Sequence, residues 1–191
     1  MITSNLIQTV QDFVYKEIEI TSTPSRFQLD YTNDKGQLLA EKLQADKNIV
    51  LLGTLLMDCK LGQAFKEGRL KDHIEMSVQR AEELLSQDGE ITSEEKEIVL
   101  ACVREHHGAE KFSSLEAEIC CNADCYRFIS VEGVIGSIYH WQEKMPIEKL
   151  ISLFREKAEE KWNALSLDMC RKELEPEYKA VKHLLDCYKG E

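Results

Sequence analysis

Adjacent histidines in the middle of the chain are the first residues whose types and spacing suggest metal chemistry. His106 and His107 precede Gly108, at the expected end of an amphipathic helix. Neighbouring helical positions point about 100° apart, so both side chains can reach one site only at a helix end or beside a wide cavity. A histidine at a helix carboxyl end also interacts favourably with the helix dipole, and this simpler interpretation remains open.

Two aspartates stand in otherwise apolar surroundings. Asp58 follows the run IVLLGTLLM, and Asp124 lies within NADCYRF on a predicted helix. Carboxylates are rarely buried unless they are paired with a cation or bind a metal. Both aspartates are therefore candidate ligands. The alternatives are a solvated helix end for Asp58 and a salt bridge from Asp124 to Arg127, three residues later.

The seven cysteines suggest packing rather than a disulfide framework. Their number is odd and none forms a CxxC pair, so a closed zinc ribbon is not expected. Cys121 and Cys125 would share a helix face and could bind a soft metal, although buried cysteines more often serve as core residues. Reduced thiols and the absence of a recognisable signal peptide lead us to expect a cytoplasmic protein.

Helical periodicity dominates the sequence and predicts an all-α domain of about eight helices. The expected helices cover residues 6–18, 34–43, 48–58, about 74–85, 92–107 and 113–130, with two more after Pro146 and Pro176. Thr92 with Glu95, and Ser113 with Glu116, have the spacing of capping boxes. The segment 59–72 is expected to be a polar, glycine-punctuated connection, and the alternating EIEIT could mimic a strand.

Composition excludes several classes of function. The 191 residues carry 24 basic and 35 acidic side chains, for a net charge of −11. This excess disfavours nucleic acid or an anionic membrane as a partner. The longest apolar run, residues 49–57, is far shorter than the roughly 20 residues that span a bilayer. We expect a small phosphorylated ligand instead, and the oligomeric state is left open.

The order of these segments resembles the HD superfamily of metal-dependent phosphohydrolases, which have an all-α fold. The residues that carry the resemblance are LLGTLLMDCK, ending near Asp58; GRLKDHIEMSVQRAEELL, where His73 opens a helix; IVLACVREHHG; and SLEAEICCNADCYRF, which contains Asp124. The match covers about residues 27–191. It implies one HD-like domain over residues 1–191.

Within that domain, the resemblance implies a core over about residues 27–130 and a helical extension over about 146–189. The family's first metal site uses an early histidine, an adjacent His-Asp pair and a distant Asp. Here the corresponding positions hold Thr32 and Met57 in place of the two histidines. The first site is therefore expected to be degenerate.

The second metal site of two-metal members has its full counterpart here. The resemblance places Asp58, His73, His106 and His107 around one divalent ion, which could be Zn, Fe, Mn or Ni. It implies hydrolysis of a phosphate ester, by analogy a nucleotide. Asp124 would act as general base or orient the water.

The phosphate would be held by Lys60 and Arg69. The alternative interpretation is that these two cations belong to a solvated loop and bind no ligand. Two other classes of function stay open. One is a catalytically inactive HD-like domain that binds a nucleotide, a metabolite or a protein partner. The other is a purely structural helical module. Fold alone does not choose among them.

Overall fold

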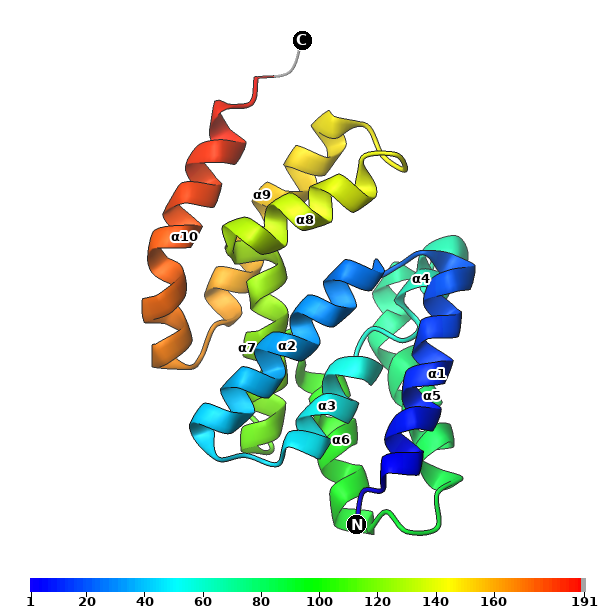
Figure 1. Ribbon diagram of the computed structural model, residues 1–191. Coiled ribbons are helices and arrows are strands. Elements are labelled where there is room, and N and C mark those ends of the chain that lie inside the picture. The colour runs from blue at the N-terminus through cyan, green and yellow to red at the C-terminus, as the bar shows by residue number, and fades with distance from the viewer. Residues whose placement is uncertain (190–191) are drawn as a thin grey trace.

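The structure, a computed structural model, describes residues 1–189 as a bundle of helices with no strand in that range (Figure 1). It contains the α-helices α1 (Ser4–Thr21), α2 (Arg26–Leu43), α3 (Lys47–Leu56), α4 (Leu61–Lys66), α5 (His73–Ser86), α6 (Ser93–Glu105), α7 (Leu115–Ile129), α8 (Val131–Trp141), α9 (Ile147–Ala164) and α10 (Asp168–Cys187), and the 3₁₀ helix η1 (Leu70–Asp72). The predicted all-α fold is confirmed. None of the described helices is both long and apolar enough to cross a membrane.

Local hydrogen bonds explain where most helices begin and end. The capping box of Thr92 and Glu95 opens α6 as predicted. A second capping box, formed by Ser25 and Gln28, starts α2 eight residues earlier than the periodicity suggested. The cap of α7 is Ser114 rather than Ser113, whose hydroxyl donates to Glu105 instead.

The alternating EIEIT, whose pattern could mimic a strand, belongs to the end of α1. Two predictions about local structure were wrong. The segment 59–72 is not only a connection, because it contains α4 and η1. The last helix does not start after Pro176, because α10 begins at Asp168 and runs through the proline. The exposed proline removes one N–H donor only, and the buried stripe continues across it. That stripe consists of Cys170, Leu174, Tyr178, Val181 and Leu185.

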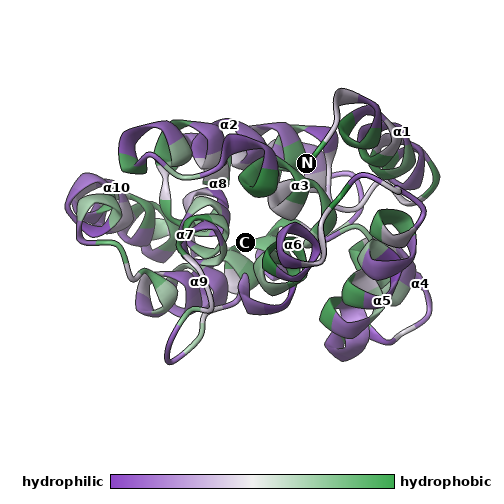
Figure 2. Ribbon diagram, turned by 90° about the horizontal axis from the view of Figure 1, so that it is seen from below, coloured by the Kyte–Doolittle hydropathy of each residue, from purple (hydrophilic) through white to green (hydrophobic). Residues whose placement is uncertain are grey.

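Helix α7 lies at the centre of the bundle. It packs against α2, α3, α6, α8, α9 and α10. The hydrophilic residues, purple in Figure 2, lie mainly on the outer sides of the surrounding helices. A helix covered on every side must find partners for its polar groups inside the protein. The buried polar side chains of α7 are Asn122, Asp124 and Arg127.

The apolar interior consists of two cores. The larger involves α1, α2, α3, α5, α6 and α7 together with parts of α9 and α10, and the smaller lies among α8, α9 and α10. Gly136 allows α8 to lie close to α2, since a Cβ there would be 2.2 Å from Cζ of Phe27. The C-terminal helices therefore pack directly on the rest of the bundle.

Candidate metal and phosphate site

Helix α3 carries Asp58 into the interior of the protein. Gly53 makes this possible, because a Cβ at that position would lie 2.6 Å from Cβ of Cys102 and 2.7 Å from Sγ of Cys120. The close approach buries the end of α3 and the two residues that follow it. Met57 is 1% exposed and Asp58 is 4% exposed. Asp58 is therefore a buried carboxylate and not a solvated helix end.

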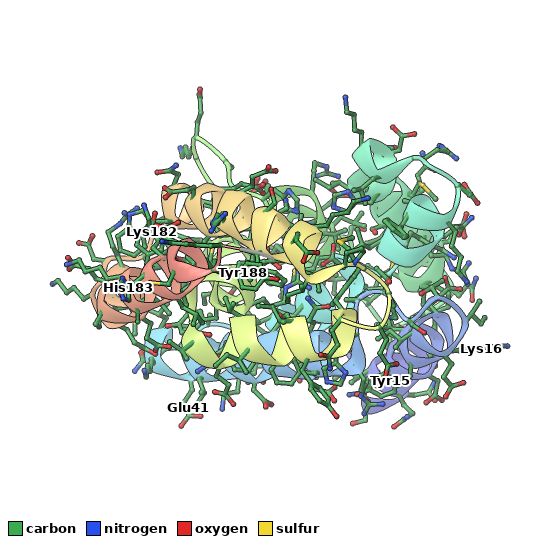
Figure 3. All side chains as sticks on the ribbon, turned by 90° about the horizontal axis from the view of Figure 1, so that it is seen from above. Tyr15, Lys16, Glu41, Lys182, His183 and Tyr188 are labelled. Carbon is green, nitrogen blue, oxygen red and sulfur yellow. The ribbon has the colours of Figure 1, made fainter. Side chains whose placement is uncertain are left out.

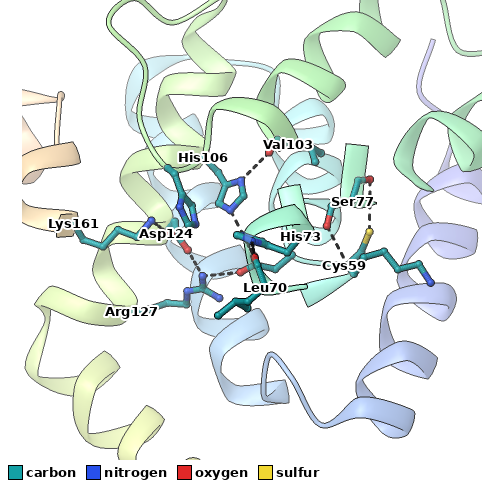
Figure 4. A network of polar contacts seen from close by, with 12 residues as sticks. Cys59, Leu70, His73, Ser77, Val103, His106, Asp124, Arg127 and Lys161 are labelled. Carbon is teal, nitrogen blue, oxygen red and sulfur yellow. Dashed lines mark hydrogen bonds and ion pairs between the residues drawn. The ribbon is translucent and has the colours of Figure 1, made fainter. Parts of the chain in front are cut away.

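The three candidate histidines converge beside Asp58, and Figure 4 labels two of them, His73 and His106. His73 is the first residue of α5, and His106 and His107 follow the last residue of α6. One ring nitrogen from each lies within 4.8 Å of the others, and the rings of His106 and His107 are 4.4 Å apart. Among the described residues this is the group of potential ligands that gathers closely enough to hold a metal ion.

Hydrogen bonds fix the tautomers of two of these histidines. Nδ1 of His73 lies 2.7 Å from the Leu70 carbonyl oxygen, and Nδ1 of His106 lies 2.7 Å from that of Val103. A carbonyl oxygen only accepts, so each Nδ1 carries a hydrogen, and each Nε2 is the ring nitrogen that remains for a metal ion. Backbone carbonyls orient metal-binding histidines in this way.

Both Nε2 atoms face the same carboxylate oxygen. Nε2 of His106 is 3.5 Å from Oδ1 of Asp58, and Nε2 of His73 is 3.8 Å from it. His106 is fully buried, and its Nε2 has no hydrogen-bond partner among the described residues. A cation bound between the two ring nitrogens and the carboxylate would give all three atoms a partner. These residues therefore fit a divalent metal ion.

The third histidine is also a neutral ligand candidate. Burial, together with the neighbouring His106 and Lys161, lowers the pKa of His107 to about 3. Its imidazole is therefore uncharged at neutral pH. A neutral imidazole keeps a lone pair that can bind a metal.

The other side of Asp58 belongs to a buried network of ions. Nη2 of Arg127 lies 2.7 Å from Oδ2 of Asp58 and also bonds Asp124, and Nζ of Lys161 lies 2.6 Å from Oδ2 of Asp124. Burial alone would raise the pKa of both carboxyls. Arg127, together with His106 and His73 beside Asp58 and with Lys161 beside Asp124, outweighs it and holds both pKa values well below the usual range. The four charges cancel in pairs.

The residues that the resemblance assigns to the first metal site offer few metal ligands. Thr32 is fully buried, but its hydroxyl donates to the Gln28 carbonyl at 2.9 Å, and Met57 offers only a thioether. The two aspartates are both bonded by the guanidinium of Arg127. These residues do not fit a metal ion at the first site.

A cavity of about 280 Å³ opens above this cluster. Its charged floor is formed by Asp58, His73, His107, Arg127 and Lys161, and its walls are mainly apolar. Asp124 and His106 do not line it. The site thus combines a candidate metal ligand set, two cations and a space that can admit a small organic molecule.

The structure does not bring Lys60 and Arg69 into this cavity. Both line a separate depression near Phe13. Lys60 pairs with Glu17 at 3.1 Å, and Arg69 pairs with Asp72 at 3.0 Å. The carboxylates already satisfy both cations on their own side of the molecule.

Sequence reasoning missed the cations that do line the cavity. Arg127 was considered only as a partner of Asp124, and Lys161 gave no signal because it lies in a highly charged stretch of α9. The two remaining histidines lie elsewhere. His140 stacks on Phe27, and His183 is on the outer part of α10 near Tyr188, 3.6 Å from the Cys187 sulfur (Figure 3).

The sequence matches no family model and no curated protein. Solved structures do match. A predicted HD superfamily hydrolase from an uncultured Thermotogales bacterium aligns with a TM-score of 0.66 and 19% identity, over 94% of this chain and 88% of that one. A protein of Lactobacillus plantarum aligns with a TM-score of 0.68 and 20% identity, over 97% and 96% of the two chains.

Bacillus subtilis YpgQ also aligns, with a TM-score of 0.65 and 18% identity over 97% of each chain. The TM-scores establish a shared fold. Because the sequence identities are only 18–20%, the chemistry has to be argued from the residues of the site. The helices, their order and the position of the histidine cluster agree with the predicted resemblance. The chain therefore has the fold of the HD superfamily.

Proposed function

We propose that the chain is a metal-dependent phosphate-ester hydrolase that holds one divalent ion on Asp58, His73, His106 and His107. The observation that carries the proposal is the convergence of two oriented Nε2 atoms on Oδ1 of Asp58 in a buried space. Three imidazoles and one carboxylate suit Zn, Fe, Mn or Ni. When bound, such an ion lowers the pKa of a coordinated water and polarises a phosphoryl oxygen.

The protein residues hold the ligands and set the charge of the floor. Arg127 bonds Oδ2 of Asp58 and so keeps Oδ1 turned toward the histidines. Asp58, Asp124, Arg127 and Lys161 cancel, and an imidazole binds a metal in its neutral form, so a bound divalent ion would give the floor two positive charges. A phosphate monoester dianion neutralises this charge, whereas a diester carries one negative charge only. We therefore propose a monoester as the substrate.

The surroundings of Asp124 favour a positioning role over that of general base. Two cations hold its pKa far below neutral, and it does not line the cavity. A carboxylate with a strongly lowered pKa is a poor proton acceptor. Its contacts instead orient Arg127 and Lys161 toward the floor. A direct catalytic role for Asp124 stays a prediction from the resemblance.

A second candidate function is ligand binding without catalysis. Arg127 and Lys161 line the cavity, and such side chains bind phosphate oxygens directly, without a metal. The two candidates differ in metal content. The hydrolase needs an ion on the histidine cluster, whereas the binding domain needs only the cations of the floor.

The test is elemental analysis of the full chain, purified without a metal-affinity column, together with turnover of p-nitrophenyl phosphate. We expect about one transition metal ion per chain after supplementation with manganese. His107→Ala should lower metal affinity and turnover by at least about 10- to 100-fold, because it removes a metal ligand and loss of even a ligand's hydrogen-bond partner costs that much. The control, His140→Ala, removes an exposed histidine outside the site and should change neither.

Two outcomes would contradict the proposal. A chain that binds inorganic phosphate but no manganese, iron, nickel or zinc would be the non-catalytic binding domain. Equal turnover of p-nitrophenyl phosphate by His107→Ala and by the unchanged chain would remove the histidine cluster from the chemistry.

A further inference from the structure

The walls of the cavity have a different character from its floor. Leu61 and Phe65 of α4 and Leu70 of η1 contribute one side. Trp141 at the end of α8, Met145 in the following loop and Leu153 of α9 contribute another. Phe128 and Phe154 also line the space. A ligand whose charged group rests on the floor would therefore extend between apolar side chains.

Several apolar side chains that line the cavity are exposed to solvent, and contacts with their neighbours hold Phe65 and Trp141 in position. Phe65 is 50% exposed and Leu70 is 49% exposed, although both are large and apolar. The rings of Phe65 and Trp141 meet edge to face with their centroids 6.3 Å apart. The indole Nε1 of Trp141 donates to Oε1 of Gln28 at 3.1 Å. Exposed apolar side chains beside a cavity commonly mark a binding surface.

Two polar groups beside the walls, Oε1 of Gln28 and Nζ of Lys157, already have partners. Oε1 of Gln28 accepts from the backbone N–H of Ser25 as well as from Trp141. Lys157, a lining residue from α9, pairs with Glu160 at 2.7 Å. A ligand rich in hydroxyl groups would lose its hydration here and gain few hydrogen bonds in return.

We infer that Phe65 and Trp141 determine substrate specificity and select a phosphate monoester whose alcohol carries an aromatic or otherwise apolar group. The inference rests on the proposed function for the phosphate end of the ligand. The apolar end rests independently on the wall residues. An aromatic ring placed against Phe65 and Trp141 removes apolar surface of both partners from water.

The experiment compares two phosphonates whose C–P bond is not hydrolysed, so that binding is separated from turnover. Isothermal titration of the full chain, supplemented with manganese, measures the affinity for phenylphosphonate and for 2-hydroxyethylphosphonate. We expect phenylphosphonate to bind at least about tenfold more tightly, because only its ring buries apolar surface against the walls.

Variants assign that preference to the walls. Phe65→Ser should remove most of the preference for the phenyl group and leave the affinity for 2-hydroxyethylphosphonate unchanged. Trp141→Phe, which keeps a ring but loses the bond to Gln28, should weaken phenylphosphonate binding less. The matched control is Tyr139→Ser. Tyr139 lies on α8, as Trp141 does, but it is 68% exposed and does not line the cavity. It should change neither affinity.

The inference is overturned if the two phosphonates bind equally, if neither binds, or if Phe65→Ser weakens both to the same extent. These results are distinguishable from failure of the proposed function. A chain that hydrolyses phosphate esters but binds both phosphonates equally is a hydrolase without this specificity. A chain that prefers phenylphosphonate but neither holds a metal nor turns over substrate has the apolar site and is not a hydrolase.

Discussion

Four charged side chains in the interior balance one another beside the candidate metal ligands. Arg127 is 4% exposed, Lys161 1% and Asp124 0%, so none of these charges is solvated to any useful extent. A buried ion pair adds little to stability by itself, because desolvation offsets the attraction between the charges. Removing one partner is costly, since it leaves an unpaired charge in the interior. Substitution of Arg127 should destabilise the protein most, because this side chain pairs with two carboxylates.

Arg127→Met should lower the free energy of unfolding by about 3–5 kcal/mol, because Asp58 loses its cation and Asp124 loses one of two. Urea denaturation followed by circular dichroism measures this change. The control, Arg69→Met, removes an arginine whose ion pairs are exposed to solvent and should have no measurable effect. Equal stability of the two variants would show that Arg127 does not hold the carboxylates.

At the scale of elements, one helix determines where the metal ligands meet. α3 packs against α2, α6 and α7, and its carboxyl end delivers Asp58 to the histidines at the start of α5 and the end of α6. The distance between α3 and its neighbours depends on Gly53. A larger residue there would have to push apart helices that carry different parts of the site.

Gly53→Ala should destabilise the protein by about 1–3 kcal/mol, because the new methyl group meets Cys102 and Cys120 in a closely packed core. The same displacement should lower the affinity for manganese. Thermal unfolding and metal titration measure the two effects. Gly89→Ala is the matched control, since a Cβ there would meet no atom within 4 Å. A Gly53→Ala variant as stable as this control would contradict the role assigned to the glycine.

At the scale of the whole molecule, the fold separates six of the seven cysteines from solvent. All seven are free thiols; six are buried and Cys187 is exposed. Burial raises the pKa of Cys59 to about 12 and that of Cys170 to about 11. Cys121 and Cys125 lie in the interior of α7 and serve as core residues. The reactive form of a cysteine is the thiolate, so the buried thiols should be unreactive in the folded protein.

Ellman's reagent at pH 8 should therefore modify about one thiol per folded chain and all seven in guanidinium chloride. Because the pKa values of Cys59 and Cys170 are raised, these thiols stay protonated at pH 8. Cys187→Ser should abolish the reaction of the folded protein while leaving six thiols to react after denaturation. Rapid modification of a second cysteine in the folded chain would contradict the observed burial.

The sequence by itself determined most of the helices, though not α4 or α8, and the order of the segments that carry the ligands. Apolar residues at helical spacing and the capping box of Thr92 and Glu95 act within one or two turns, so they can be recognised locally. The same locality explains the errors, since a proline such as Pro176 breaks a pattern in the sequence but not always a helix. Asp58 and the three histidines were identified because their spacing resembles that of a known fold.

Only the tertiary structure decided how these residues work together. Arg127 reaches Asp58 across 69 positions of the chain, and Lys161 reaches Asp124 from a different helix. Lys60 and Arg69, near the ligands in sequence, lie instead beside another depression. Charge and hydrophobicity are properties of each residue. Burial and ion pairing depend on which helices pack together, and no local pattern records that.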